Sequence, residues 1–195
     1  MPIVLRFPIT LVLLIVCLAV PAWADYQAGM DAYLRGDYAT ALREWRPLAE
    51  QGDADAQYNL GVMYDKGPGV PQDYVQARQW YEQAAAQGDA NAQSNLGVMY
   101  EKGRGVSQDY VQARQWYEKA AAQGDANALY NLGLLYRYGY GVPQDFVQAH
   151  KWCNLAGANG NKDAATLRDA LAILMTPAQV DEARKLAREW QPKKP

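Results

Sequence analysis

A sequence repeat of 36 residues constrains the fold of this chain more strongly than any other feature. Residues 52–87 (repeat 1) and 88–123 (repeat 2) differ at six of these 36 positions, and residues 124–159 (repeat 3) follow the same template with more substitutions. A fixed period of this size is typical of solenoids, in which each unit is a helical hairpin that cannot bury its apolar side alone. The repeat therefore predicts an all-α solenoid of stacked hairpins, with about ten helices after residue 24.

The pattern inside repeat 1 predicts a first helix at residues 54–66 and a second at residues 74–86. Asp53 is suited to accept the free amides of the first helix, and Gly67 is suited to the left-handed position that closes it. Asp73 followed by Gln76 predicts a capping box before the second helix. The equivalent capping boxes in the other two repeats are Asp109 with Gln112 and Asp145 with Gln148.

Each first helix carries a glycine in its middle, where glycine costs about 1 kcal/mol relative to alanine. A cost that recurs in every repeat indicates a recurring compensation. We expect the absent side chain to let the first helix approach an indole of the second helix. The pairs are Gly61 with Trp80, Gly97 with Trp116, and Gly133 with Trp152.

A glycine-rich loop, such as "KGPGVPQD" in repeat 1, links the two helices of every repeat. A GxG pair can indicate phosphate binding, but that interpretation requires a preceding strand. Here the loop joins two helices and recurs three times, so we expect a structural turn, with Val70, Val106 and Val142 packed between the helices.

The two ends of the chain depart from the template. Arg6, an apolar run at residues 9–20 and the small-x-small sequence Ala22-Trp23-Ala24 predict a signal peptide at residues 1–24, cleaved before Asp25. The run is short for the alternative, an uncleaved membrane anchor. We therefore expect a periplasmic or secreted protein with no membrane attachment after cleavage. Residues 25–51 predict a shorter N-terminal hairpin, in which Ala41 and Trp45 take the parts of Ala77 and Trp80.

Residues 160–195 predict a C-terminal pair of capping helices and a tail. The first helix is expected at residues 163–174, and Thr176 with Gln179 forms a capping box with Pro177 at the first position of the second. Terminal units of a solenoid must cover an otherwise exposed apolar face.

Composition excludes several function classes. The net charge of −2 gives no basic face for nucleic acid. One cysteine, Cys153, and one histidine, His150, follow residue 24, so no internal disulfide can form and two ligands make a poor metal site. We predict no cofactor, no metal and no nucleophile–base pair; Cys153 stands where the other repeats have Tyr81 and Tyr117.

The segment "GDADAQYNLGVMYDKGPGVPQDYVQARQWYEQAAAQ" resembles a Sel1-like repeat, the longer relative of the tetratricopeptide repeat. The N-terminal hairpin resembles an ordinary tetratricopeptide unit. The resemblance implies a right-handed α-solenoid that acts as an adaptor for proteins or peptides and is not an enzyme. Some secreted relatives are rich in disulfides and were suspected of binding or hydrolysing β-lactams; with Cys153 alone, this chain departs from them.

By the same resemblance, a partner binds residues of the first helices that line the inner curve. The candidate residues are Asp55, Tyr58, Asn59, Val62, Asn91, Asn95, Val98, Asn127, Tyr130, Asn131, Leu134, Arg137 and Tyr138. Asn59, Asn95 and Asn131 could grip an extended peptide, since an amide both donates and accepts, or could bond neighbouring helices. Repeat 3 gathers Tyr138 and Tyr140 with Arg137, a mixture favoured at interfaces.

These patterns favour an exported, monomeric, non-enzymatic adaptor that binds a protein or peptide partner. One alternative is a hydrolase or small-molecule binder that acts on cell-wall or β-lactam-like ligands. Another is a structural element that associates with copies of itself, because near-identical repeats could stack end to end.

Overall fold

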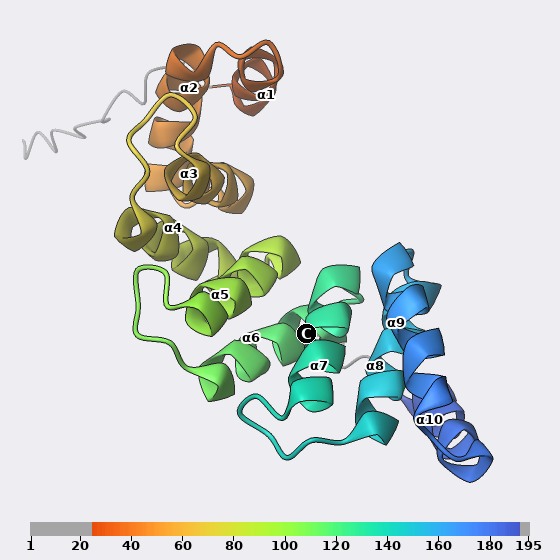
Figure 1. Ribbon diagram of the computed structural model, residues 1–195. Helices are drawn as coiled ribbons and strands as arrows, with labels where there is room; N and C mark the ends of the chain where they lie inside the picture. The colour runs from red at the N-terminus through yellow and green to blue at the C-terminus, as the bar shows by residue number, and fades with distance from the viewer. Residues whose placement is uncertain (1–24, 192–195) are drawn as a thin grey trace, which may run out of the picture.

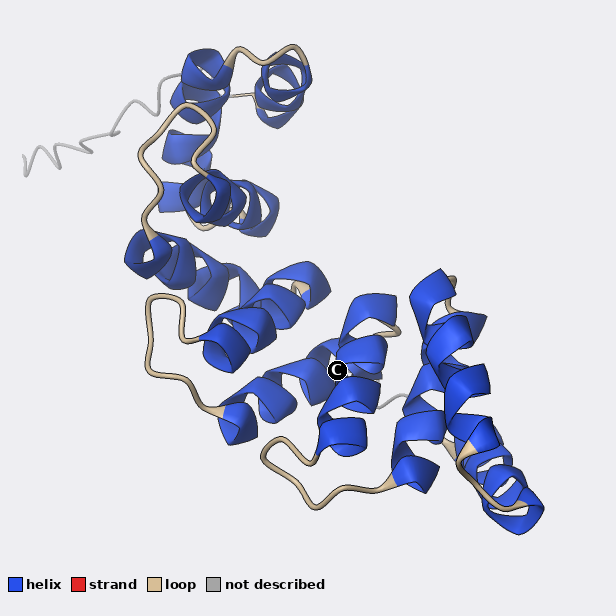
Figure 2. Ribbon diagram, viewed as in Figure 1, coloured by secondary structure: helices blue, strands red, loops and turns tan. Residues whose placement is uncertain are grey.

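The computed structural model describes residues 25–191, and within this range the chain forms ten α-helices and no strand (Figure 2). The predicted signal peptide and its cleavage site lie outside the described residues, except for Asp25 itself. Among the described helices, none has the length and apolar character needed to span a membrane.

The helix boundaries confirm the hairpin pattern read from the repeats. In chain order the helices are α1 (Tyr26–Leu34), α2 (Tyr38–Glu50), α3 (Ala54–Lys66), α4 (Tyr74–Ala86), α5 (Ala90–Lys102), α6 (Tyr110–Ala122), α7 (Ala126–Tyr138), α8 (Phe146–Ala158), α9 (Lys162–Ile173) and α10 (Pro177–Glu189). In repeat 1 both helices begin and end where predicted. Helix α9 begins and ends one residue earlier than expected, because Asn161 caps it.

The helices stack in sequence order along an arc (Figure 1). From α1 to α9 each helix packs on the next, and contacts from α3 to α5, from α5 to α7 and from α7 to α9 connect the first helices of neighbouring hairpins. Helices α1, α3, α5, α7 and α9 line the inner side of the arc, whereas α2, α4, α6 and α8 lie on its outer side (Figure 1). Both α9 and α10 pack on α8, which closes the C-terminal end. The predicted all-α solenoid is therefore confirmed.

The predicted caps form at both ends of the inner helices. The carboxylate of Asp53 accepts a hydrogen bond from the amide of Ala56, and Asp89 and Asp125 cap α5 and α7 in the same way. Gly67 closes α3 with a φ of 79°, in the left-handed region that glycine enters without steric cost.

The prediction of a capping box at Asp73 is wrong, although Asp73 does cap α4. Its carboxylate accepts from the amides of Val75 and Gln76, but its own amide donates to the carbonyl of Tyr64 on the preceding helix. A capping box needs that amide for the Gln76 side chain, which donates to the Asp73 carboxylate instead. The same backbone bond excludes the predicted boxes at Asp109 and Asp145, whereas the box between Thr176 and Gln179 is confirmed.

The mid-helix glycines do meet side chains of the second helix, but the predicted indole partners are wrong. A Cβ placed on Gly61 would lie 2.5 Å from the Tyr81 ring, and one on Gly97 would lie 2.4 Å from the Tyr117 ring. In repeat 3 the neighbour of Gly133 is the Cys153 sulfur, at 2.6 Å. The partner is therefore the residue after each tryptophan.

In the first hairpin a glycine also lies against a side chain of the second helix, and there the side chain is an indole. A Cβ on Gly29 would lie 2.4 Å from Nε1 of Trp45, so Trp45 takes the part of Tyr81 rather than that of Trp80. Trp80 instead packs against two cores, that of the first hairpin and that of repeat 1. Tyr81 thus joins the two helices of one hairpin, and Trp80 joins neighbouring hairpins.

The glycine loop of each repeat contacts the preceding hairpin. A Cβ on Gly105 would lie 2.4 Å from the carbonyl oxygen of Tyr74, at the start of α4. Gly69 and Gly141 approach Tyr38 and Tyr110 with similar closeness. These loops therefore hold neighbouring hairpins together, which agrees with the structural role expected for them.

A glutamine network that the sequence reasoning missed crosses the same boundaries. Nε2 of Gln93, which is buried, donates to the carbonyl of Ala85, and Nε2 of Gln123 donates to Oε1 of Gln93 at 3.0 Å and to the carbonyl of Gly88 at 2.8 Å. Gln57 and Gln87 repeat this arrangement one unit earlier. The identical glutamines at a spacing of 36 residues were its only signal in the sequence.

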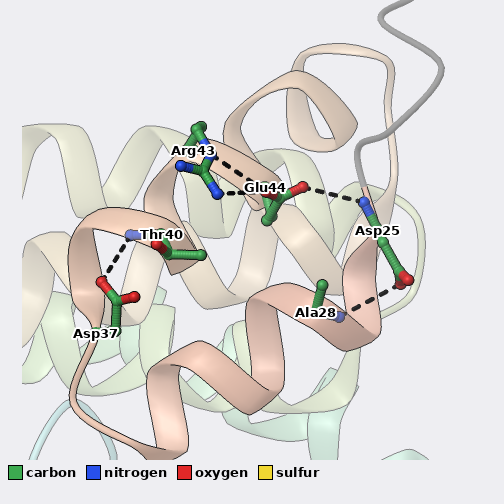
Figure 3. A network of polar contacts seen from close by, with 6 residues as sticks. All are labelled: Asp25, Ala28, Asp37, Thr40, Arg43 and Glu44. Carbon is green, nitrogen blue, oxygen red and sulfur yellow. Dashed lines mark hydrogen bonds and ion pairs between the residues drawn. The ribbon is translucent and has the colours of Figure 1, made fainter.

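The start of the described chain is tied to the first hairpin (Figure 3). The Asp25 carboxylate caps α1 by accepting from the amides of Gln27 and Ala28. The backbone nitrogen of Asp25 donates to Oε2 of Glu44 at 3.4 Å, and Arg43 binds the other oxygen of that carboxylate at 3.0 Å.

Candidate functional site

The thirteen candidate binding residues all lie on the inner helices α3, α5 and α7, and none of them is fully buried. Asp55, Asn91, Asn127 and Tyr138 are exposed, and the other nine are half-buried. Val62, Val98 and Leu134 also pack against the core, so they offer less free surface than the polar members of the set. The first helices therefore present a mainly polar and tyrosine-rich surface.

The asparagines of this face are engaged with tyrosines of the chain itself. Nδ2 of Asn59 donates to the hydroxyl of Tyr26 at 3.0 Å, across the boundary between the first two hairpins. Burial raises the pKa of the Tyr58 hydroxyl, and the side chain of Asn95 partly opposes this rise. Asn131 acts on Tyr117 in the same sense. Of the two roles considered for the asparagines, a hydrogen bond to a neighbouring helix is therefore the one observed for Asn59.

A buried tyrosine hydroxyl lies behind the asparagines in each of the first two repeats. Burial raises the pKa of both Tyr81 and Tyr117, so both hydroxyls stay protonated at neutral pH. Tyr117 donates to Oε2 of Glu101 at 2.7 Å. The hydroxyl of Tyr81 has no partner at normal hydrogen-bond geometry among residues 25–191, although the side chain of Asn95 lies close enough to oppose the effect of burial on its pKa.

Repeat 3 and α9 line a shallow, open pocket of about 320 Å³ at the C-terminal end of the inner face. Its lining combines two of the predicted residues with α9: Tyr130, Arg137, Asp163, Thr166, Leu167 and Ala170. Arg137 stands where the preceding repeats have the acidic residues Asp65 and Glu101. The pocket thus contains charges of both signs, with no ion pair between them within 4.0 Å among the described residues.

A row of tyrosines adjoins this pocket, and we call Tyr110, Tyr138 and Tyr140 the tyrosine platform. The rings of Tyr110 and Tyr140 stack with centroids 4.8 Å apart, and those of Tyr138 and Tyr140 stack at 5.5 Å. Tyr138 and Tyr140 remain 50% and 44% exposed. The guanidinium of Arg137 lies 5.0 Å from the Tyr138 centroid, so one residue connects the pocket with the platform.

A second pocket, of about 350 Å³, lies at the outer helices and the C-terminal end. It is lined by Glu118, Ala122, Lys151, Trp152, Trp190 and Gln191. The two indoles meet edge to face with centroids 5.7 Å apart. The sequence reasoning did not find this pocket, because it forms only where α10 packs on α8.

His150 and Cys153 are both buried in α8. Burial raises the pKa of the Cys153 thiol to about 12, so the thiolate that a nucleophile requires is not formed at neutral pH. Among the described residues, no group of three or more His, Cys, Asp and Glu side chains is arranged to hold a metal ion. Cys153 instead fills the space beside Gly133.

Comparison with known proteins agrees with the 36-residue repeat and the helical solenoid described above. Residues 54–89, 90–125 and 126–161 each match the family model described as Sel1 repeat. A Sel1 repeat protein from Oxalobacter formigenes with a known crystal structure is 32% identical, with a TM-score of 0.72; the match covers 83% of this chain and 68% of that one.

A protective antigen of uropathogenic Escherichia coli strains, which displays an SLR fold, is also 32% identical, with a TM-score of 0.50. That match covers 84% of this chain but 44% of the antigen, so this chain spans less than half of its length. A comparison with curated proteins gives no match.

Proposed function

Because the chain belongs to the Sel1 repeat family, whose repeats commonly form scaffolds for protein–protein interaction, we propose that it is an adaptor for a protein or peptide partner. The partner lies along the inner face formed by α1, α3, α5, α7 and α9. Binding requires shape and many weak contacts, and the adaptor makes or breaks no covalent bond.

The single observation that carries this proposal is the pocket beside the tyrosine platform. Tyrosine and arginine supply large, amphipathic contact area and are enriched among the residues that dominate binding energy. Here Arg137 lies between a pocket of about 320 Å³ and the half-exposed ring of Tyr138. Neither Arg137 nor Tyr138 is needed to fill the core, so both remain available for a partner.

The protonated, buried thiol of Cys153 supports an adaptor rather than an enzyme. A thiol with a pKa of about 12 is a poor nucleophile, and His150, the one histidine of the chain, is buried as well. The proposal therefore assigns the inner face to binding alone.

Export to the periplasm or to the medium is part of the proposal. Its support is the sequence of residues 1–24, with a short basic region, an apolar run and a small-x-small end. Asp25, the expected first residue after cleavage, caps α1, so a chain cleaved there would keep the cap of its first helix.

Site-specific crosslinking in cells tests the proposal. A photoreactive phenylalanine analogue at Tyr138 samples the inner face, and the same analogue at Gln115, an exposed residue of the outer helix α6, is the matched control. We expect a discrete crosslinked partner from position 138, absent from position 115 and lost on Arg137→Ala. Equal products at both positions, or none at 138, would contradict the proposal.

The asparagines need a separate test, because Asn59 also holds two hairpins together. An Asn59/Asn95/Asn131→Ala variant is compared with the wild type for partner recovery from an envelope extract, after denaturation curves show that both are folded. Unchanged recovery removes the asparagines from the binding surface.

A further inference from the structure

Arg137 reverses the charge that the other repeats carry at its position on the inner face. The equivalent residues of repeats 1 and 2 are the acids Asp65 and Glu101. Glu101 accepts a hydrogen bond from the hydroxyl of Tyr117 at 2.7 Å. In repeat 3 that tyrosine is replaced by Cys153, so this internal hydrogen bond has no counterpart there.

The guanidinium of Arg137 is unpaired and can be approached from solvent. Among residues 25–191, no carboxylate lies within 4.0 Å of it. Its side chain is half-buried and lines the open pocket of about 320 Å³ between α7 and α9. A charge that is partly removed from water without a counter-ion costs free energy, which a bound anion offsets.

The tyrosine platform beside Arg137 also favours an anion. Tyr140 stacks on both Tyr110 and Tyr138, with centroids 4.8 and 5.5 Å apart, so ring faces are used within the platform. Tyr138 and Tyr140 therefore offer mainly ring edges and hydroxyl groups to solvent, where they are 50% and 44% exposed. Ring edges carry partial positive charge, and a phenolic hydroxyl donates a hydrogen bond.

The carboxylate of Asp163 lies at the other end of the pocket. Arg137 follows Tyr130 by seven residues, which is about 10 Å along α7. Burial raises the pKa of the Tyr130 hydroxyl and Asp163 raises it further, so this carboxylate acts at the Tyr130 end. The pocket is thus positive where it adjoins the platform and negative at its far end. A peptide suits both ends, because it brings backbone N–H donors together with any acidic side chain.

We propose that this end of the inner face binds an acidic segment of the partner, with an aspartate or glutamate side chain on Arg137. The partner's carboxylate accepts two parallel hydrogen bonds from the guanidinium and a third from the hydroxyl of Tyr138. A backbone N–H group of the same segment donates to the carboxylate of Asp163.

The opposite charge of the earlier repeats gives such a segment one position on the inner face. Burial raises the pKa of the Asp89 carboxyl, and the nearby carboxylates of Asp55 and Asp125 raise it further. An acidic segment is therefore repelled at the start of α3, α5 and α7 and attracted to Arg137 near the end of α7. The inference rests on the proposed adaptor function and names the chemistry of one part of the partner.

Blocked peptides test the site directly, because their only charges are those of their side chains. The probes are acetylated and amidated glycine peptides with two adjacent glutamates, and matched peptides with glutamine or lysine in their place. Binding is followed through the ring signals of Tyr138 and Tyr140 in protein with ¹³C-labelled tyrosine, assigned with Tyr138→Phe and Tyr140→Phe. We expect the glutamate peptide to shift these signals saturably, and the other two to bind at least about tenfold more weakly.

Acetate and inorganic phosphate, at the concentration of the peptide, probe a free anion. Both lack the backbone N–H groups that Asp163 accepts, so we expect no saturable shift from either.

Arg137→Gln is the decisive variant, because it removes the charge and keeps a polar side chain. We expect it to weaken the glutamate peptide by at least about tenfold and to leave the denaturation midpoint nearly unchanged, since no ion pair of the described residues is lost. The matched control is Arg104→Gln, which removes the cation that lies over the Tyr74 ring one repeat earlier. This control should leave the response of Tyr138 unchanged.

Arg137→Glu is a second variant, which places at this position the residue that repeat 2 carries in Glu101. We expect it to fold and to abolish binding of the glutamate peptide.

Four results would overturn the inference: equal binding of the glutamate and glutamine peptides, undiminished binding by Arg137→Gln, acetate or phosphate as effective as the peptide, or no response to the glutamate peptide. Each of them can occur while crosslinking at Tyr138 still captures a partner, so failure of this acidic specificity is distinguishable from failure of the adaptor function.

Discussion

The ring of Tyr117 lies so close to Gly97 that a Cβ on the glycine would be 2.4 Å from ring carbon Cδ1. We therefore expect Gly97→Ala to destabilise the protein by about 1–3 kcal/mol, since overpacking outweighs the gain in helix propensity. Gly157 of α8 is the matched control, because a Cβ there would meet Ala165 at an ordinary 3.6 Å. Gly157→Ala should be neutral or stabilising by up to about 1 kcal/mol. Denaturant unfolding measures both, and equal effects would refute the close contact.

The glutamine network predicts a second stability effect. Gln93→Ala removes a donor to the Ala85 carbonyl and the acceptor for Gln123, so we expect a loss of about 1–3 kcal/mol. Gln115→Ala, on the exposed side of α6, should change stability by less than about 0.5 kcal/mol. Comparable midpoints for the two variants in chemical denaturation would show that the network contributes nothing.

Cys153 predicts how stability depends on alkaline pH. Its thiol has a pKa of about 12 in the folded chain and about 8.5 when unfolded, so the unfolded state loses the proton first. This contribution to stability is complete below about pH 8.5 and is lost as the pH rises toward 12, at about 1.4 kcal/mol per pH unit. Cys153→Ala should make the free energy of unfolding decline less steeply between pH 8.5 and 10, a range that lies between the two pKa values. If the substitution leaves the slope of stability against pH unchanged, groups other than Cys153 cause the decline.

The Asp25 nitrogen predicts a difference between processed and unprocessed chains. In a chain that begins at Asp25 this atom is an ammonium, 3.4 Å from the Glu44 carboxylate; with preceding residues it is a neutral amide. Glu44→Gln should therefore cost about 0.5 kcal/mol more in the shorter chain, a value suited to a partly exposed pair. Denaturation of the four proteins forms a double-mutant cycle, and a zero coupling energy would exclude the ion pair.

Period and helix boundaries were predictable because each repeat carries its own caps and apolar stripe. The side chains that contact the mid-helix glycines were not predictable. Trp80 and Tyr81 are adjacent on α4, and their roles separate only when the preceding hairpin is in place to cover Trp80. The four-residue spacing from Ala41 to Trp45, which matches Ala77 to Tyr81, was the available signal for the correct partner.

The candidate site was only partly predictable for a similar reason. Tyr130 and Arg137 were identified as inner-curve residues through the resemblance, but their pocket also needs Asp163 and Leu167 of α9, which follows no repeat template. Glu101 accepts a hydrogen bond from Tyr117, whereas Asp65, which is one methylene shorter, accepts none from Tyr81, and this difference appears only when the side chains are placed in three dimensions.

The loops that place Gly69, Gly105 and Gly141 against the preceding hairpin would allow the molecule to be lengthened by whole repeats. Each of these loop contacts spans a single boundary between hairpins. A further copy of the 36-residue unit inserted at the centre would therefore find the same contact on both of its sides. Lengthening of this kind extends the inner face by one repeat and leaves the first hairpin and the C-terminal pair α9 and α10 unchanged.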